Sequence, residues 1–268
     1  MKAIGVIGCG NMGSALMFGM LKKHFRTASE ITSWDPDKRK LNRVTQSLGI
    51  RKAKSNVELA QGVRIILLAV KPQQMEEVLD EVRPALTHRP LLISVAAGIP
   101  IRWIEKRVGQ SIPVVRVMPN TPALVGFGVS AIAPGRSARS IHLKAAQQIF
   151  KSVGEVVRVP ERWMDAVTAV SGSGPAYFFY LMEQMIQAGL ELGLSKKVAR
   201  HLVIETALGA AELARRAGED PEDLRVRVTS KGGATEAAFR VFARRHLGEV
   251  LRSGIRAAAA RSKELARR

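Results

Sequence analysis

A chain of 268 residues, 46% of them hydrophobic, is long enough to bury a sizeable core in one large domain or two. Its single cysteine, Cys9, excludes an intrachain disulfide and a thiolate metal cluster, and the sequence predicts neither a signal peptide nor a membrane-spanning segment. The net charge of +19 suggests a nucleic-acid-binding protein, but the basic residues are spread out and few aromatic residues accompany them. We therefore expect a generally basic surface and no nucleic-acid partner. Because neither a signal peptide nor a membrane-spanning segment is predicted, we expect the protein to be cytoplasmic.

The first predicted elements are a strand and a helix joined by glycines. Residues 3–7 form an apolar run typical of a strand, and residues 14–22 have a helical pattern. In such a turn the first glycine allows the tight bend, the second lets the backbone approach a pyrophosphate, and the third packs the helix against the strand. The N–H groups at the helix N-terminus then face the phosphates. The residues predicted to bind the cofactor here are Gly8, Gly10, Asn11, Met12 and Gly13.

A second strand is predicted at residues 30–34, followed by Asp35-Pro36 and a basic helix. Asp35 lies 22 residues after Gly13, close to the separation at which a carboxylate binds the adenosine ribose in such folds. Asp35-Pro36 also suits a helix N-cap followed by the first helical residue, and the sequence leaves both roles open. Since Lys38 and Arg39 could instead bind a ribose 2′-phosphate, the choice between NADPH and NADH is open as well.

Three further apolar runs, at residues 63–70, 91–95 and 113–117, are typical of strands buried on both faces of a parallel sheet. Small or polar residues stand where each run ends. Because the carboxyl ends of parallel strands meet at one edge of the sheet, we expect these residues to line a dinucleotide cleft. They are Ala69, Val70, Lys71 and Pro72 at the first strand, Ala97 and Gly98 at the second, and Asn120 at the third.

Two more strands, at 128–133 and 154–159, flank a helix at 137–153, and no convincing strand follows residue 160. We therefore predict an α/β protein with a Rossmann-type dinucleotide-binding domain at 1–160 and an all-α domain at 161–268. The helix expected at 176–192 is apolar almost all round, which a domain of about a hundred residues can hardly bury alone. We expect it to be buried against a second subunit, in a homodimer or a larger assembly of dimers.

The remaining helices are predicted from their caps. Ser195 reads as the N-cap of a helix to about residue 216, and Asp220-Pro221 reads as the start of a short helix. Two last helices are expected at 234–245 and 247–267.

Two loops rich in hydroxyl groups and glycines precede predicted helices. In the first, VSGSGPAY at 170–177, Ser173 either caps a tight turn or binds substrate, and free N–H groups there could hold an anion. In the second, VTSKGGAT at 228–235, the paired Gly232 and Gly233 offer backbone N–H groups to a carboxylate. A helix cap alone would need neither the paired glycines nor so many hydroxyl groups. We therefore favour a carboxylate site there, with the Thr235 hydroxyl near a substrate nitrogen.

At these residues the chain resembles pyrroline-5-carboxylate reductase. The likeness rests on AVKP at 69–72, AAG at 96–98, MPNTP at 118–122, DAVTAVSGSGPAY at 165–177 and the loop at 229–235, and it reaches RSKEL at 261–265. It implies a Rossmann domain, a helical domain interleaved with that of a partner subunit, and reduction of pyrroline-5-carboxylate to proline by NADPH or NADH. By this resemblance Asn56 also faces the cofactor, and Ser230, Gly233, Ala234 and Thr235 face the substrate.

The implied reaction passes a hydride from the nicotinamide to the C=N carbon, while the protein orients both partners. Ser230 would bind the carboxylate, and Thr235 or solvent would provide the proton. Lys231 stands where the family usually has proline, which places a positive charge in a loop that is freer to move. The five histidines are scattered without metal-ligand spacing, so no metal site is predicted.

Two alternatives compete with this interpretation. A β-hydroxyacid dehydrogenase shares the layout but uses a lysine on the helix that begins near residue 175, where this chain has no lysine until Lys196. A basic nucleotide-sensing or nucleic-acid-binding protein that has lost turnover is the other, and salt-sensitive DNA binding without imine reduction would favour it.

Overall fold

The computed structural model describes residues 4–265, which fall into two compact units. The first unit comprises the residues up to Ser173 together with those from Ala258 onward, and the second comprises Gly174–Ala257. The first unit thus extends to Ser173, beyond the domain boundary that the sequence predicts near residue 160, and the division of the domains at 160 stays a prediction. No helix among the described residues combines the length and apolar character needed to cross a membrane.

The first unit is built on an eight-stranded sheet in the order β3-β2-β1-β4-β5-β6-β7-β8. Strands β1 to β6 are parallel, β7 is antiparallel to β6, and β8 is parallel to β7. The direction of strand addition reverses between β1 and β4, which is where open α/β sheets bind ligands. The strands are β1 (Ile4–Ile7), β2 (Ile31–Trp34), β3 (Arg51–Lys52), β4 (Ile65–Leu68), β5 (Leu91–Ser94), β6 (Val114–Met118), β7 (Gly128–Pro134) and β8 (Gly154–Arg158).

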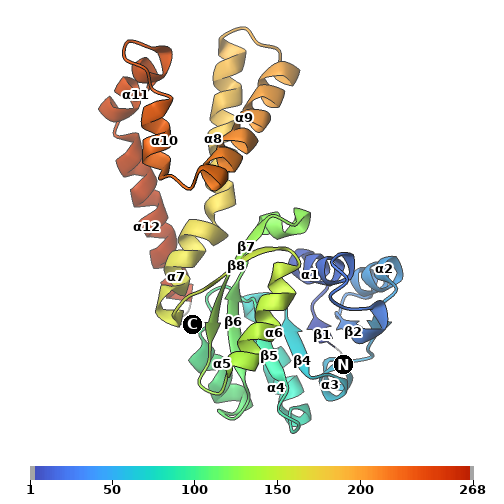
Figure 1. Cartoon of the computed structure of the whole chain (residues 1–268). Coiled ribbons are helices and arrows are strands. Elements are labelled where there is room, and N and C mark those ends of the chain that lie inside the picture. The colour runs from blue at the N-terminus through green and yellow to red at the C-terminus, as the bar shows by residue number, and fades with distance from the viewer. Residues whose placement is uncertain (1–3, 266–268) are drawn as a thin grey trace. The chain divides into compact units, whose positions relative to one another are not determined.

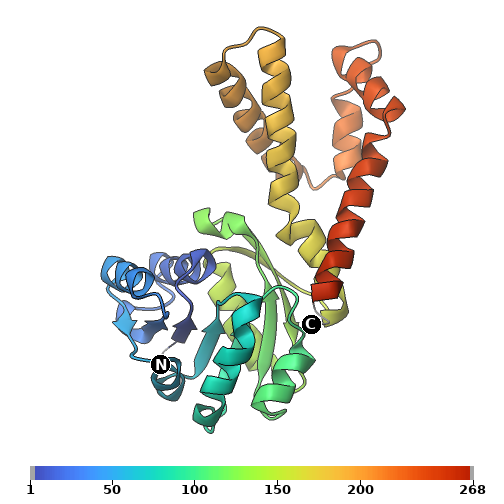
Figure 2. The same cartoon turned by 180° about the vertical axis from the view of Figure 1, so that it is seen from behind.

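Helices cover both faces of this sheet (Figure 1). One hydrophobic cluster joins the sheet to α1 (Asn11–Lys22), α2 (Lys38–Leu48) and α6 (Ser140–Lys151), with Phe150 and Met17 fully buried. A second cluster joins the other face to α3 (Asn56–Gly62), α4 (Met75–Val82) and α5 (Ile101–Val108), the side that comes forward in Figure 2. Burial on both faces explains why β1 and β5 consist of continuously buried residues.

Short helical segments connect these elements. They are the 3-10 helices Ala28–Glu30, Pro72–Gln74, Arg83–Ala85, Thr121–Val125 and Glu161–Trp163, the α-helix α7 (Met164–Val167) and a π-helix at Thr168–Gly172.

The end of the final helix packs with the first unit. Ser262 donates a hydrogen bond from Oγ to Oδ1 of Asp165 at 2.7 Å, which fastens residues 258–265 to the rest of that unit.

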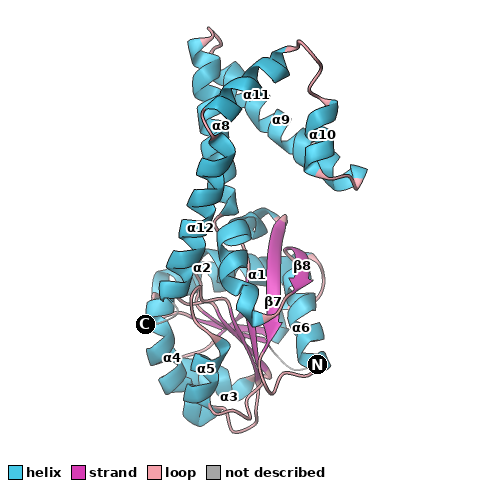
Figure 3. Ribbon diagram, turned by 90° about the vertical axis from the view of Figure 1, so that its left-hand side faces the viewer, coloured by secondary structure: helices cyan, strands magenta, loops and turns pink. Residues whose placement is uncertain are grey.

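The second unit is helical throughout its described length, as the colouring in Figure 3 shows. It contains α8 (Gly174–Glu191), α9 (Lys196–Ala217), α10 (Pro221–Arg227), α11 (Ala234–Arg244) and the first part of α12 (Leu247–Leu265). Along α8 only Gly174 and Gly189 are buried, while Phe178, Phe179 and Tyr180 are each more than 60% exposed. A helix so apolar and so exposed has a surface that one chain leaves uncovered.

The predicted elements are confirmed with small shifts in their limits. Ser195 caps α9 by accepting a hydrogen bond from the Val198 N–H, and Asp220 stands at the N-cap of α10. The last residues of the final predicted helix lie outside the described residues. The sequence analysis did not identify β3, α3, α4 and α5.

The tight turn expected around Ser173 is wrong. The chain stays helical from α7 through the π-helix at Thr168–Gly172, and the Ser173 N–H donates to the Thr168 carbonyl at 2.8 Å. The Ser173 N–H, which was expected to be free at a helix N-terminus, is therefore engaged by the backbone. The anion site in this loop stays a prediction.

Candidate cofactor and substrate sites

The glycine turn after β1 separates the roles of its three glycines. Gly8 has a φ of +106°, and a Cβ there would lie 2.5 Å from the Ala69 carbonyl oxygen. A Cβ on Gly13 would lie 2.1 Å from the Gly8 carbonyl oxygen, so this glycine packs α1 against the turn itself. A Cβ on Gly10 would meet nothing within 4 Å. The fold therefore requires glycine at 8 and 13, whereas the space beside Gly10 is open to a ligand.

Helix α1 begins directly at this open space. Its N-cap is Gly10, which has no side chain to cap the first N–H groups, and no acidic residue stands in its first turn. The positive end of the helix and its unpaired N–H groups thus face the space that Gly10 leaves. This is the arrangement that binds a phosphate at a helix N-terminus.

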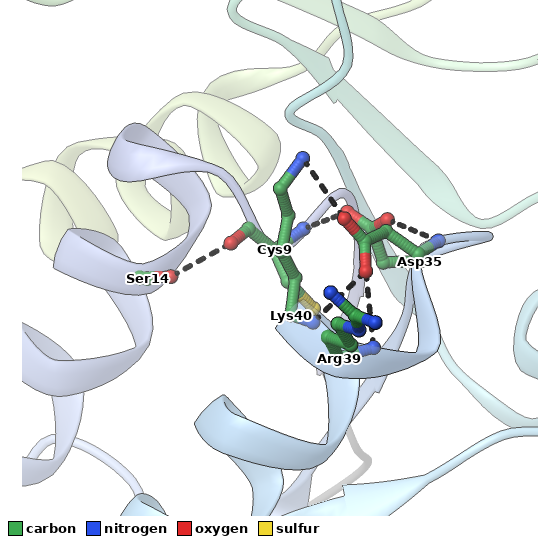
Figure 4. Close-up of polar contacts among 6 residues, drawn as sticks. Cys9, Ser14, Asp35, Arg39 and Lys40 are labelled. Atoms are coloured by element: carbon green, nitrogen blue, oxygen red, sulfur yellow. Dashed lines mark hydrogen bonds and ion pairs between the residues drawn. The ribbon is translucent and has the colours of Figure 1, made fainter.

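Asp35 belongs to this turn and not to the cap of α2 (Figure 4). Its Oδ2 accepts the Cys9 N–H at 2.7 Å and its Oδ1 accepts the Asp37 N–H at 2.8 Å. The N-cap is Asp37, whose Oδ1 accepts the N–H groups of Arg39 and Lys40. The interpretation of Asp35-Pro36 as N-cap and first helical residue is therefore wrong by two positions, because the sequence offers two aspartates and the second one caps.

A cleft of about 390 Å³ opens at this edge of the sheet. Seven of the residues predicted to bind the cofactor line it: Gly8, Gly10, Asp35, Asn56, Ala69, Val70 and Lys71. Strands β1, β2 and β4 end here, so the cleft lies at the point where the strand order reverses. This position is the one that the sequence analysis predicted for a dinucleotide.

The other predicted cofactor residues lie outside this cleft. Asn11 is exposed, Met12 packs against the core, Gly13 is buried, and Pro72 opens a 3-10 helix. Ala97 and Gly98 follow β5, where Gly98 turns the chain with a φ of +74°. These positions stay predictions for the rest of the cofactor.

Asn120 links three segments near the end of β6. Its Oδ1 accepts the Val129 N–H at 2.9 Å, and its Nδ2 donates to the Ser171 carbonyl at 3.3 Å. The side chain thus ties β7 and the π-helix to the carboxyl end of β6. Ser173 is half-buried directly after that π-helix.

One face of α4 and its preceding turn forms a wall of the cleft that the sequence analysis missed. Gln74, Glu77, Val78 and Glu81 line the cleft, at the spacing of one helical face. This stripe would have been visible had a helix been predicted between the strands β4 and β5. The sequence analysis also missed Trp34, Asp37 and Lys40 as lining residues.

Asn56 is the most constrained polar residue of the cleft. Its side chain is 7% exposed, and Nδ2 donates to Oε2 of Glu81 at 2.7 Å. Its buried Oδ1 has no hydrogen-bond partner among the described residues. A buried acceptor without a partner costs free energy, so a ligand that donates a hydrogen bond here would be favoured.

Cys9 is buried inside the turn and contacts Ser33, with Sγ and Oγ 3.1 Å apart. Burial raises the pKa of the Cys9 thiol, and the Asp35 carboxylate raises it further. The thiol is thus a packing group of the glycine turn.

The hydroxyl-rich loop before α11 has a defined structure in the second unit. Gly232 has a φ of +74°, and the Gly233 N–H donates to the Ser230 carbonyl at 3.0 Å. The Thr229 hydroxyl donates to the Arg225 carbonyl at 2.6 Å, so it closes the end of α10. Ser230 and Lys231 are exposed.

The start of α11 presents the groups predicted for a carboxylate. Gly233 is the N-cap and has no side chain to satisfy the first N–H groups, which belong to Ala234 and Thr235. The Gly232 N–H already donates to Oε2 of Glu236 at 2.8 Å, and Arg240 also binds this oxygen. The loop therefore binds a carboxylate of its own chain. Glu236 was missed by the sequence analysis, although its position three residues after the N-cap is typical of a capping box.

The described residues contain no candidate metal site. Among residues 4–265, no cluster of three or more histidine, cysteine, aspartate or glutamate residues is arranged to hold a metal ion.

The family model described as "Pyrroline-5-carboxylate reductase dimerisation" matches residues 161–265, and that described as "NADP oxidoreductase coenzyme F420-dependent" matches residues 3–98. The chain is 41% identical to a pyrroline-5-carboxylate reductase of Pseudomonas aeruginosa over 264 residues, which cover 98% of this chain and 96% of that protein.

Solved structures agree with these matches. A pyrroline-5-carboxylate reductase from Coxiella burnetii superposes with a TM-score of 0.93 at 34% identity, over 99% of this chain and 98% of that one. The pyrroline carboxylate reductase of Plasmodium falciparum, a structure with NADP bound, gives a TM-score of 0.90 at 32% identity over the same shares.

Proposed function

The chain belongs to the pyrroline-5-carboxylate reductase family, and we propose that its glycine turn and the loop before α11 are the cofactor and substrate sites of this enzyme. It is an NAD(P)H-dependent oxidoreductase that reduces the C=N bond of 1-pyrroline-5-carboxylate to give proline, the last step of proline biosynthesis. The roles of the individual residues are proposed from the geometry of the two sites.

Two observations support the cofactor assignment. The space beside Gly10 is one that a Cβ would enter, and it adjoins the uncapped N-terminus of α1. The buried Oδ1 of Asn56 lacks a donor in the same cleft. When bound, the cofactor supplies the hydride that the C=N carbon accepts. In this proposal the N–H groups of α1 bind its phosphates, and Asp35 and Asn56 accept hydrogen bonds from its hydroxyl groups.

The substrate assignment rests on the start of α11. We propose that the N–H groups of Ala234 and Thr235 and the hydroxyl of Ser230 bind the substrate carboxylate, with Gly232 and Gly233 shaping the loop. In pyrroline-5-carboxylate the ring nitrogen is bonded directly to the carbon that bears the carboxylate. The Thr235 hydroxyl, at the second position of the helix, is then the group that hydrogen-bonds the nitrogen and holds a proton there. Ser173 is proposed as a further substrate contact.

The test of this assignment is a pair of substitutions in one loop. Thr235→Val keeps the shape and removes the hydroxyl, and it should lower both kcat and kcat/KM by about a hundredfold or more. Ser230→Ala should mainly raise the KM for the imine. Thr229→Val is the matched control, because its hydroxyl binds the Arg225 carbonyl and should affect stability alone. Imine reduction by Thr235→Val at the wild-type rate, with unchanged KM and NAD(P)H affinity, would contradict the placement of the nitrogen.

The chain forms a homo-oligomer, since the dimerisation model of the family matches residues 161–265. We propose that the assembly is a dimer or is built from dimers, with α8 at the contact, because this helix leaves its aromatic residues exposed within one chain. In functional terms we assign residues 1–160 to the cofactor and 161–268 to the substrate and the partner subunit. Limited proteolysis with activity and sedimentation measurements on the fragments tests this division.

We also propose that the enzyme acts in the cytoplasm and without a nucleic-acid partner. Five arginines of the second unit form ion pairs with glutamates of the same unit, which reduces the positive charge available to the phosphates of a nucleic acid. These arginines are Arg215, Arg216, Arg225, Arg227 and Arg240. Cell fractionation tests the location. Titration with duplex DNA at low and physiological salt tests the second point, and tight salt-sensitive binding would contradict it.

A further inference from the structure

The cofactor cleft is acidic in a protein whose net charge is +19. Four carboxylates line it, from Asp35, Asp37, Glu77 and Glu81, against two lysines, Lys40 and Lys71. The local balance of charge thus opposes that of the whole chain. The N–H groups at the N-terminus of α1 can compensate the charge of a pyrophosphate. Beside the Asp35 carboxylate a further ligand group with two negative charges is disfavoured, whereas an uncharged group that donates hydrogen bonds is not.

Asp35 is held in this cleft by its backbone contacts. It is 9% exposed, and each carboxylate oxygen accepts one backbone N–H, from Cys9 and from Asp37. These two bonds fix the carboxylate beside the glycine turn. A carboxylate has about four acceptor positions, so further hydrogen bonds from a ligand can still be accepted.

The basic residues next to Asp35 do not offset it. Lys38 and Arg39 are exposed and do not line the cleft. Lys40 does line it, but its Nζ lies 3.4 Å from Oδ2 of Asp37, with which it forms an ion pair in the first turn of α2 (Figure 4). The lysine of this turn that lines the cleft is therefore already paired with a carboxylate of the same turn.

Asn56 adds a second, independent requirement for a donor. Glu81 accepts from its Nδ2 and so leaves Oδ1 as the buried atom without a partner. Two residues that line the cleft thus carry acceptors, Asp35 at the glycine turn and Asn56 with its buried Oδ1. The hydroxyl groups of a ribose diol are donors, but a ribose 2′-phosphate has only acceptor oxygens near neutral pH and carries a charge that Asp35 repels.

We propose that this enzyme selects NADH over NADPH, and that the Asp35 carboxylate is the specificity-determining group, with Asn56 as the second acceptor for the adenosine ribose. This inference rests on the assignment of the cleft to the cofactor made above. It decides a choice that the sequence left open, since Lys38 and Arg39 were candidates for binding the 2′-phosphate.

Equilibrium binding to the full-length protein without substrate tests the proposal. Calorimetric titrations with NADH, NADPH, ADP-ribose and 2′-phospho-ADP-ribose give the selectivity for the whole cofactor and for its adenosine half. The wild-type protein should bind each ligand without the 2′-phosphate at least tenfold more tightly than its phosphorylated counterpart. Asp35→Asn removes the charge, so it should reduce this ratio at least threefold. Its single oxygen can accept only one of the two backbone N–H groups that Asp35 accepts, so the Tm without ligand should fall.

Two controls make the result specific. Glu76→Gln removes a carboxylate of α4 that pairs with Arg107 and does not line the cleft, so it should leave the ratio unchanged. Asp35→Ser is the second variant if Asp35→Asn proves poorly folded. Equal or tighter binding of the phosphorylated ligands by the wild type overturns the proposal, as does an unchanged ratio in a folded Asp35 variant. Binding of neither cofactor would overturn the assignment of the cleft itself and this inference with it, whereas equal binding of both would leave the cleft assignment intact.

Discussion

Substituting the second and third glycines of the turn separates ligand binding from folding, because a methyl group meets different surroundings at each. A Cβ on Gly10 would have no atom within 4 Å, whereas a Cβ on Gly13 would lie 2.1 Å from the Gly8 carbonyl oxygen. Gly10 also has an ordinary φ of −71°, which alanine adopts without strain. We therefore expect Gly10→Ala to fold and lose cofactor, and Gly13→Ala to lose stability.

The magnitudes follow from these contacts. At Gly10, alanine is the poorer N-cap but restricts the unfolded chain, and the two effects nearly cancel, to within about 0.5 kcal/mol. At Gly13 backbone must shift, which typically costs about 1–3 kcal/mol and corresponds to a fall in Tm of about 2–12 °C for a unit of this size. The Gly10 methyl group occupies space assigned to the pyrophosphate, so cofactor affinity should fall at least about tenfold, or about 1.4 kcal/mol.

Thermal unfolding without ligand measures the first effect for both variants. Trp34 lines the cleft, so the quenching of its fluorescence by NADH measures the second. A Kd for reduced cofactor that is unchanged in Gly10→Ala would refute the placement of the pyrophosphate. A Tm of Gly13→Ala equal to that of the wild type would refute the packing argument.

Three other predictions concern a cap, a thiol and the subunit contact. Asp37→Ala removes the N-cap of α2 and should lower the Tm at pH 7 by about 2–4 °C. The hydrogen bond from the Lys40 N–H lowers the pKa of Asp37, so the ionised Asp37 stabilises the fold at every pH above the ordinary pKa of aspartate. The difference in Tm between variant and wild type should disappear as the pH falls through the lowered pKa of Asp37. Cys9 should react with iodoacetamide at pH 8 at least about tenfold more slowly in the folded than in the unfolded protein, because burial raises the pKa of its thiol and excludes the reagent; equal rates would contradict this burial. Phe179→Asp places a charge on the exposed apolar surface of α8 and should shift the protein toward monomers in sedimentation at micromolar concentration, and an unchanged assembly would place the contact elsewhere.

Every strand except β3 could be predicted, because each of the others carries a signal in its own sequence. Continuous apolar runs such as 65–68 and 91–94 are dictated by burial on both faces, and this pattern does not depend on distant residues. Strand β3 lacks that signal, since Arg51 and Lys52 are exposed and their pairing with Thr32 and Ser33 depends on the sheet already being there. The helices α3 to α5 are short, so each has too few residues for its amphipathic pattern to stand out between the predicted strands.

The residues of the candidate site could be predicted where the backbone geometry of the site allows only one type of residue. The glycines of the turn are of this kind, and Gly8 and Gly13 are confirmed as steric requirements of the fold. The role of Asp35 depended on which of two nearby aspartates caps α2, a choice made by the backbone around Pro36. Glu236 lies in a helix that was predicted, but its hydrogen bond with the Gly232 N–H depends on the conformation of the loop before that helix. The α4 wall lies on a helix that the sequence analysis did not identify.

The docking of residues 258–265 onto the first unit affects the order in which the protein can be completed during synthesis. The ribosome makes the eight strands first, then the whole second unit, and only then the turn of α12 that carries Ser262. Its hydrogen bond with Asp165 therefore joins residues that are 97 positions apart, with the whole second unit synthesised between them. The first unit can therefore acquire this helical segment only after the second unit has been synthesised, and the surface around Asp165 stays uncovered by it until then.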